Sequence, residues 1–416
     1  MRETKTLEFK EEITNTFLKT VSAFANYETG RILFGVNDEG KEIGIINPVQ
    51  ACLDIENKIN DSIEPSPEYS LQINKKTSVI TLTVFEGLHK PYLYKSKAYR
   101  RNDSASIPVD RLELTRLILE GKNISFEELP ADNQDLVFNE LSKKLSNALN
   151  ISELNKDTLK TLELYSDKDG FNKAGELLSD SNRFNGIDIV RFGENISIIL
   201  DRENIENESV LKQYDDAINV YKKYYQYEQI KGSLRKTVSL IPEEAFREAI
   251  ANAIVHRTWD INASIQISMY SDRIEVVSPG GLPNGIKEEE YRRGGLSVLR
   301  NRILGNVFLR LNMIERFGTG IRRINETYRN SEVKPVFKIT ENSIIVILPV
   351  LEQKYNLTDD EAKIFELLKN REMSSSAIAE YTGFGKNKVI TILKNLVDKG
   401  YVSVSGQGRG IRYTRQ

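Results

Sequence analysis

Glu248 and Asn252 stand four residues apart in the segment IPEEAFREAIANAIVHR, residues 241–257. Side chains at this spacing project from one face of a helix, and Pro242 fits the first turn, where its missing N–H costs nothing. His256 lies one further turn along the same stripe. A carboxylate and an amide one turn apart suit a site for a metal-bound phosphate chain.

Two glycine-rich turns follow this helix and offer places for phosphate oxygens. Gly318, Thr319 and Gly320 come directly before a second predicted helix, which begins at Ile321. The free N–H groups and the dipole at the start of a helix attract anions. An earlier turn contains Gly280 and Gly281 after a predicted strand.

Composition limits the other kinds of chemistry. The chain has 416 residues and a net charge of −2, so two to four domains are expected, with no global basic field. Cys52 is the only cysteine, and His89 and His256 are the only histidines, which disfavours thiolate or histidine metal cages. The N-terminus lacks an apolar signal region and no apolar run is long enough to span a bilayer, so we expect a cytoplasmic protein with no membrane partner.

The chain divides into four predicted regions, and the fold class is α+β multidomain. Residues 1–115 alternate short strands and helices. Residues 116–235 form a connecting region, with helices expected at 134–149, 154–165 and 210–227 and strands between them. Residues 236–352 form an α/β unit, in which TVSLIP leads into the helix of Glu248 and two strands join near Asp272. We leave open whether the connecting region is a domain or packs around this unit.

Residues 356–416 have the pattern of a winged helix-turn-helix. Thr358 and Ser374 cap the first two helices, GFGKN turns into a third, and an alternating hairpin with a glycine-rich tip follows. Basic residues outnumber acids from this turn onward, which favours contact with DNA over contact with a protein. The expected DNA-binding residues are Lys386, Lys388, Lys394, Arg409 and Arg412.

Three segments carry family resemblances. Residues 1–44, with Glu8-Phe9-Lys10, Ala23 to Asn26 and Gly35 to Asp38, resemble the Schlafen AlbA-like domain, which is described as DNA-binding. The segments FREAIANAIVHRTW, DRIEVVSPGGLPNG, RNRIL and IERFGTGIRRI resemble the divergent ATPase domain of RecG-like transcriptional regulators, a GHKL (Bergerat) α/β sandwich. The winged helix-turn-helix is the third segment. Their order is that of the regulator family.

The GHKL resemblance implies ATP or another nucleotide with Mg²⁺. Asn252 would hold Mg²⁺ against the phosphates and Glu248 would polarise the attacking water. The pattern departs at the first glycine box, where Ser278 and Pro279 stand in place of the base-reading Asp, with Asp272 as an alternative acid. A degenerate scaffold is the other interpretation. The expected nucleotide-binding residues are Asn252, His256, Arg257, Asp272, Gly280, Gly281, Gly318, Thr319 and Gly320.

The Schlafen resemblance implies a second chemistry. In nuclease members of that family, two glutamates five residues apart and a later aspartate hold a metal ion, and Glu3, Glu8 and Asp38 fit this pattern. Mn²⁺ or Mg²⁺ there could orient water for phosphodiester cleavage. The alternative is that Glu8 and Lys10 form an ion pair and Asp38 is a turn residue.

We therefore predict a nucleic-acid-binding, nucleotide-responsive transcriptional regulator. DNA would bind the winged helix, and RNA or single-stranded DNA could bind the N-terminal domain. The main alternative is a Schlafen-like metal-dependent endonuclease of RNA, tRNA or single-stranded DNA with a role in phage defence. A scaffold for partners and a homo-oligomer also stay open.

Overall fold

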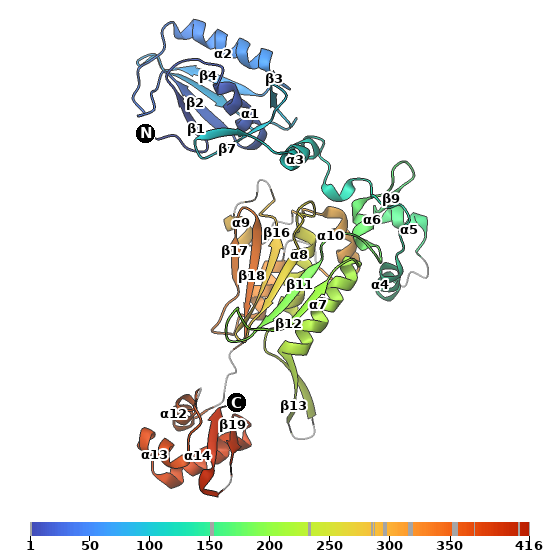
Figure 1. Ribbon diagram of the computed structural model, residues 1–416, viewed down its shortest axis with the longest axis vertical. Coiled ribbons are helices and arrows are strands. Elements are labelled where there is room, and N and C mark those ends of the chain that lie inside the picture. Colours follow the sequence, from blue (N-terminus) through green and yellow to red (C-terminus); the bar gives the residue numbers. More distant parts are fainter. Residues whose placement is uncertain are drawn as a thin grey trace. The chain divides into compact units, whose positions relative to one another are not determined.

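The computed structural model describes residues 2–149, 154–231, 234–283, 286, 288–293, 298–314, 319–351, 357–369, 371–406 and 408–415. Its contacts divide the chain into two compact units. The first comprises residues 1–330 and 334–350, and the second comprises residues 331–333 and 351–416. An α+β multidomain fold is confirmed, and the two units are described separately below (Figure 1).

The N-terminal domain is built on a four-stranded sheet in the order β1-β2-β5-β4. β1 and β2 pair in parallel because α1 connects them, and the other neighbours are antiparallel. Phe17, Val21 and Phe24 on α1 are fully buried against the sheet, as their helical spacing predicts. The elements are β1 (Leu7–Lys10), α1 (Phe17–Tyr27), β2 (Gly30–Phe34), α2 (Pro48–Ser62), β3 (Ile63–Glu64), β4 (Tyr69–Ile73), β5 (Ile80–Val84), β6 (Leu93–Tyr94), β7 (Tyr99–Asn102), β8 (Ala105–Pro108) and α3 (Arg111–Gly121).

Short capped helices follow this domain. Asp110, Asn155 and Asn172 each accept a hydrogen bond from a backbone N–H three residues later and so begin a helix. The helix expected at 154–165 is shorter, because Leu162 ends it and a small hairpin follows. The elements are η1 (Phe126–Glu128), α4 (Asn139–Leu149), α5 (Lys156–Thr161), β9 (Tyr165–Ser166), β10 (Gly170–Phe171) and α6 (Lys173–Leu178).

A six-stranded sheet in the order β12-β11-β15-β16-β18-β17 forms the centre of the first unit. β11 pairs with β15 in parallel, and all other neighbours are antiparallel. The sheet therefore crosses the expected boundary at residue 235, because β11 and β12 precede it and the other four strands follow it. The strands are β11 (Ile187–Phe192), β12 (Ile199–Ile205), β15 (Ile265–Met269), β16 (Arg273–Pro279), β17 (Val336–Ile339) and β18 (Ser343–Pro349).

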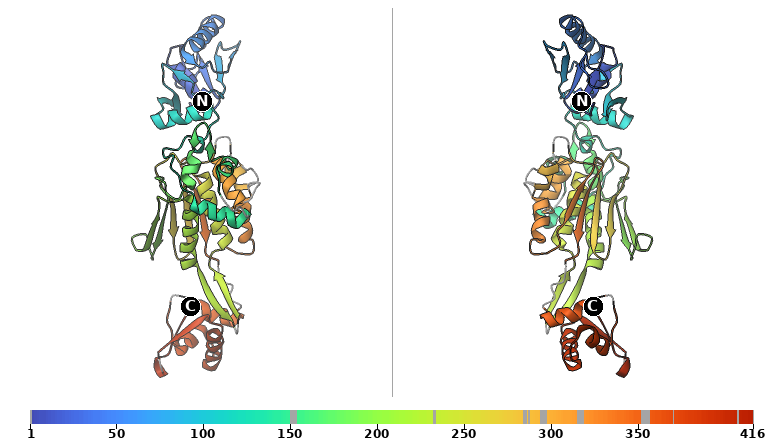
Figure 2. Two further views of the ribbon diagram at one scale, coloured as in Figure 1. Left: turned by 90° about the vertical axis from the view of Figure 1, so that its right-hand side faces the viewer. Right: turned by 90° about the vertical axis from the view of Figure 1, so that its left-hand side faces the viewer.

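Helices cover one face of this sheet. Alternate residues of the central strands are buried, as expected when only one face is covered. α8 packs against β16 and β18, and α7 packs against α8, β11 and β12. In Figure 2 the orange helices α10 and α11 lie to one side of the central sheet. The helices are α7 (Val210–Tyr225), α8 (Glu243–His256), α9 (Glu288–Arg293), α10 (Arg302–Arg310) and α11 (Gly320–Thr327).

A two-stranded ribbon, β13 (Gln226–Lys231) and β14 (Leu234–Ser239), connects α7 to α8. The sequence predicted one helix through residue 227 and a simple lead-in at TVSLIP. Both expectations differ from the structure, since α7 ends at Tyr225 and its next residues pair with β14. Figure 1 shows the ribbon projecting beyond the central sheet.

The second unit contains three helices and a hairpin around its own core. Thr358 caps α12 with a capping box, and Ser374 caps α13, as predicted. Gly383 ends α13 in the left-handed conformation, with φ 73°. The elements are α12 (Asp359–Leu367), α13 (Ser375–Thr382), α14 (Lys386–Asp398), β19 (Val402–Ser405), η2 (Gly408–Gly410) and β20 (Arg412–Arg415).

Among the described residues, none of the helices combines the length and the apolar character that crossing a bilayer requires.

Candidate functional site

α8 holds the predicted acid and amide together. The apolar face of this helix, which includes Phe246 and Ile250, is buried against the central sheet. Glu248 is only 7% exposed, and its Oε1 accepts a hydrogen bond of 3.1 Å from Asn252 Nδ2. This orientation directs the oxygen of the Asn252 amide away from the carboxylate. The pair can offer one neutral and one anionic oxygen, which are ligands that Mg²⁺ accepts.

The first residue of α11 meets this pair. A β-carbon added to Gly320 would lie 2.3 Å from Glu248 Oε1 and 2.6 Å from Asn252 Nδ2. The structure therefore brings together two parts of the candidate site that are far apart in sequence. Thr319 precedes the helix as its cap residue, whereas Gly318 lies outside the described residues. Backbone N–H groups at a helix start beside an acid and an amide can receive a metal-bound phosphate.

Gly280 and Gly281 lie where β16 ends close to two other segments. Gly280 has φ +105°, and a β-carbon there would come within 1.9 Å of Thr258 Oγ1. A β-carbon on Gly281 would come within 2.4 Å of the carbonyl of Glu341. Both glycines are thus required by close backbone packing, whether or not a nucleotide binds. Ser278, which stands where a base-reading acid was expected, donates to Ala253 O at 2.9 Å.

Asp272 does not reach this end of the strand. It lies in the turn before β16, whereas Gly280 follows the last residue of that strand. Seven strand residues span about 20 Å at roughly 3.3 Å per residue. Asp272 is exposed and pairs with Arg273 at 3.0 Å. The structure therefore gives no support to Asp272 as a substitute for the base-reading acid.

Arg257 is buried inside the protein and holds neighbouring segments of the backbone together. Its side chain is 1% exposed and lies over the Trp259 ring at 4.1 Å. It donates to the carbonyls of Asn185, Gly186 and Ala263, the last at 2.7 Å. Burial lowers the pKa of Arg257 to about 10. These carbonyls engage both terminal nitrogens of the guanidinium, while its buried Nε has no hydrogen-bond partner among the described residues. The side chain is directed into the protein, so the expectation that Arg257 contacts a nucleotide finds no support here.

His256 lies at the last turn of α8, in a position that disfavours a positive charge. Burial, and then the nearby Arg300 guanidinium, lower the pKa of His256 to about 4. The imidazole is therefore neutral at pH 7 and can donate one hydrogen bond and accept another. It has no charge to offer a phosphate.

Three residues that sequence reasoning did not select connect neighbouring segments of this unit, and one of them, Asn301, holds the end of α8. Asn301 is buried and donates to the carbonyls of Val255 at 2.7 Å and Arg257 at 2.8 Å. Arg300 donates to Gly281 O at 2.7 Å. The segment RNRIL carried a signal, because an Asn before an apolar run is typical of a helix cap.

Glu127 is the third of these residues, and it begins α10. Its two carboxylate oxygens accept from the backbone N–H of Ile303 at 2.6 Å and of Leu304 at 3.0 Å. The side chain is fully buried, and burial raises the pKa of Glu127 to about 7. No local pattern predicts this contact, because 176 residues separate Glu127 from Ile303.

The three N-terminal acids have different surroundings. Glu8 is 4% exposed and bonds to Arg101, to Thr20 Oγ1 at 2.5 Å and to Lys10 Nζ at 2.7 Å. Glu3 accepts from the backbone N–H of Phe9 at 2.8 Å, and Asp38 is exposed in a turn. Within the described ranges, no group of three His, Cys, Asp or Glu residues is arranged to hold a metal ion.

The predicted DNA-binding residues of the second unit also differ in their surroundings. Lys386, Lys394 and Arg412 are exposed. Lys388 pairs with Asp360 at 2.7 Å and lies over the Phe384 ring at 4.3 Å, so part of its role is structural. The side chain of Arg409 lies outside the described residues.

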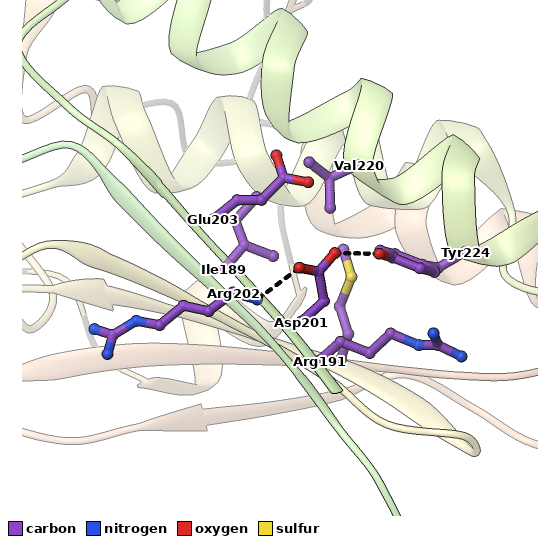
Figure 3. Close-up of a pocket in the computed structure, with 8 residues that line it drawn as sticks. Ile189, Arg191, Asp201, Arg202, Glu203, Val220 and Tyr224 are labelled. Carbon is purple, nitrogen blue, oxygen red and sulfur yellow. Dashed lines mark hydrogen bonds between the residues drawn. The ribbon is translucent and has the colours of Figure 1, made fainter. Parts of the chain in front are cut away.

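A small hollow between β11, β12 and α7 is a further candidate (Figure 3). Figure 3 shows Asp201 at its centre, directed toward the Tyr224 hydroxyl, which donates to it. Lys223 Nζ also lies 3.0 Å from this carboxylate, and Arg191 lies over the Tyr224 ring at 4.4 Å. Because its polar groups already bind one another, we assign the hollow no ligand.

Comparison with protein families identifies three domains. Residues 3–110 match "Schlafen, AlbA_2", residues 262–348 match "Putative ATP-dependent DNA helicase recG C-terminal", and residues 351–414 match "Sugar-specific transcriptional regulator TrmB". The three matches confirm the predicted order of a Schlafen/AlbA-type, a RecG-like ATPase-type and a transcriptional-regulator-type segment. The second match begins after α8, so it does not include Glu248 or Asn252.

Curated proteins give no match. Among solved structures, the DIP2311 protein of Corynebacterium diphtheriae is 19% identical over 99% of this chain and 92% of that one, with a TM-score of 0.47. The N-terminal domain of a RecG-related protein from Nitrosomonas europaea is 20% identical over 25% of this chain and 78% of that one, with a TM-score of 0.19. The domain assignment therefore rests on the three family matches.

Proposed function

We propose that this chain is a nucleic-acid-binding regulator whose central domain, a GHKL-like sandwich, binds ATP or a related nucleotide with Mg²⁺. The convergence of Glu248, Asn252 and Gly320 carries the proposal. An acid, an amide and a helix start within one contact distance form the phosphate end of such a site. Mg²⁺ in phosphate sites takes one or two protein oxygens and completes its shell with phosphates and water. Asn252 is the residue that would hold it.

The base end of the site differs from the phosphate end. Ser278 is directed into α8, and Asp272 lies at the far end of its strand. Recognition of the base therefore depends on other groups, and we expect weak discrimination between ATP and GTP. Glu248 is the candidate for polarising water, and hydrolysis is expected to be slow because catalysis needs every group positioned.

Thermal unfolding with and without nucleotide tests this function. A ligand at one hundred times its Kd stabilises the folded state by about 2.7 kcal/mol. We expect millimolar ATP with Mg²⁺ to raise the Tm of the wild type and to have little effect on Asn252→Ala. The matched control is Asp272→Asn, an exposed residue away from the pair. An unchanged wild-type Tm, or equal shifts in wild type and Asn252→Ala, would overturn the proposal.

The second unit is the proposed DNA-binding part, as a winged helix. Lys386 and Lys394 on α14 and Arg412 on β20 present positive charge to solvent. Each phosphate neutralised contributes about 0.9 to the slope of log K against log salt. Replacing all three by Gln should therefore weaken duplex binding and reduce that slope by about 3 if each contacts a phosphate. Lys369→Gln, an exposed lysine on another segment of the same unit, is the control.

We prefer this function to a nuclease because of Glu8. A catalytic metal ligand must offer its oxygens to the ion, whereas Glu8 is buried between Arg101 and Lys10. Both cations compete with a metal for the same carboxylate. The N-terminal domain is therefore proposed as a second nucleic-acid-binding surface, in which the exposed Lys95 and Lys97 are candidate phosphate contacts, whereas Arg100 pairs with Glu113 at 3.5 Å.

A further inference from the structure

The packing of α14 leaves one side of this helix open. Val389, Ile392, Leu393 and Leu396 are buried in the core of the second unit. The remaining face carries Asn387, Ile390, Thr391 and Lys394, at spacings of three, four and seven residues that place them in one stripe. Ile390 is 45% exposed, so the core does not explain this β-branched residue.

The chemistry of the stripe matches an A·T base pair. Asn387 lies in the first turn of α14 and is exposed. An Asn amide can donate a hydrogen bond to N7 of adenine and accept one from its N6 amino group. Thymine in the same pair presents a methyl group in the major groove, which binds aliphatic side chains. Ile390 is the next exposed residue of the stripe.

Thr391 is turned so that its methyl group is the part available for contact. Its hydroxyl donates to the carbonyl of Asn387 at 3.0 Å, which satisfies the donor within the helix. This bond fixes the side-chain rotamer. Asn387, Ile390 and Thr391 thus present one hydrogen-bonding amide beside two apolar groups.

Charge around the stripe suits a duplex. Lys394 is the last residue of the stripe and Lys386 precedes its first residue; both are exposed, whereas Lys388 is held by Asp360 and Phe384. The one acid of α14, Asp398, is the last residue of the helix. The stripe therefore has an exposed lysine near each of its ends, and these lysines can contact phosphates when the helix enters a groove.

We propose that Asn387, Ile390 and Thr391 read A·T base pairs in the major groove of duplex DNA. Asn387 contacts adenine, and the two aliphatic groups contact thymine methyls. This assignment rests on the proposed DNA-binding function of the second unit. A-form RNA is not the expected target, because its major groove is too narrow for a helix.

Selection from a pool of randomised DNA duplexes with the full chain tests the assignment. Wild type should enrich sites that contain A·T pairs at fixed positions, and Asn387→Ala should lose the preference at one position by about tenfold or more. Ile390→Ala and Thr391→Ser should weaken discrimination between thymine and uracil at a neighbouring position, since uracil lacks the methyl group. Asn395→Ala, an exposed Asn at the other end of α14, is the control.

The outcomes separate this inference from the function on which it rests. If the wild type binds duplexes but shows no base preference, or if Asn387→Ala selects the same sites, the A·T assignment is wrong and DNA binding stands. If no duplex binds, or if only RNA binds, both the DNA-binding function and this assignment are wrong. Circular dichroism of each variant excludes loss of folding as the cause.

Discussion

Gly320 and Glu248 are in direct contact across two helices, and no room for a β-carbon remains between them. Such an atom on Gly320 would stand 2.3 Å from the Glu248 carboxylate. The contact joins the start of α11 to the middle of α8, so it holds these two parts of the candidate site against each other. A glycine is therefore needed at this position for steric reasons.

Gly320→Ala should displace the acid and amide pair. We expect a loss of about 1–3 kcal/mol in the free energy of unfolding, the usual cost of overpacking. The Tm increase produced by ATP and Mg²⁺ should also disappear. Urea unfolding and thermal unfolding with nucleotide measure the two effects.

Gly385→Ala provides the comparison for that variant. Nothing lies within 4 Å of a β-carbon at Gly385, so this change should leave nucleotide binding unaltered. Equal nucleotide-dependent shifts in Gly320→Ala and wild type would show that the contact with Glu248 has no part in binding.

Two groups with shifted pKa values, His256 at the end of α8 and Glu127 at the start of α10, should give opposite dependences of stability on pH. The pKa of His256 is lowered to about 4, so its contribution is present above pH 6.5 and is lost as the pH falls. The pKa of Glu127 is raised to about 7, so its contribution is present below pH 4.5 and is lost as the pH rises. Each amounts to on the order of 2–3 kcal/mol between these limits.

Single variants should reveal each dependence. Compared with wild type, His256→Gln should lose stability as the pH rises from 4.5 to 6.5, because Glu127 then acts alone. Glu127→Gln should gain stability over the same range. Urea unfolding at three or four pH values measures the difference, and parallel profiles for all three proteins would contradict the assigned burial.

Arg257→Lys should destabilise the protein strongly even though it keeps the charge. One lysine amine cannot reach the carbonyls of Asn185 and Ala263 together, and each buried acceptor left without a donor costs about 1–3 kcal/mol. Asp272→Asn, which is exposed, should change stability by less than about 0.5 kcal/mol. If Arg257→Lys instead weakened nucleotide binding without loss of stability, Arg257 would be a ligand-binding residue.

Glu8→Ala should unfold the N-terminal domain more readily, at a cost of about 3–5 kcal/mol, because Arg101 would remain buried without its carboxylate. The double variant Glu8→Leu with Arg101→Met should recover most of this loss.

Asp38→Ala should have little effect on stability. Incubation of wild type and Asp38→Ala with RNA and Mn²⁺ tests the nuclease alternative, and cleavage lost only in the variant would support it.

Sequence patterns correctly predicted those features that depend on residues close together in the chain. The spacing of Glu248 and Asn252 predicted one helical face, and Thr358 and Ser374 predicted two helix starts that the structure confirms. These features depend on a few consecutive residues. The predicted course of the chain after α7 was wrong, because Val238 and Ser239 pair with Tyr227 and Gln226, which were expected to continue a helix.

Contacts between distant segments could not be predicted in this way. Arg257 is held by a carbonyl 72 residues earlier in the chain, and Glu127 by amides more than 170 residues later. Asp272 was named from its distance in sequence to the glycines, but a strand carries it to the opposite end of the sheet. Position in the sheet order, rather than residue type, decides these roles.

The parallel pairing of β11 with β15 affects how the chain can fold during synthesis. Ile187 lies beside Ile265, and β18 must take its place beyond β16 before the sheet is complete. The sheet of the N-terminal domain, by contrast, is complete by residue 84. A ribosome therefore releases a foldable first domain early, whereas one edge of β11 waits for β15, which is translated about 70 residues later. During that interval β11 can pair with β12, but the other edge of β11 stays open to pairing with another chain.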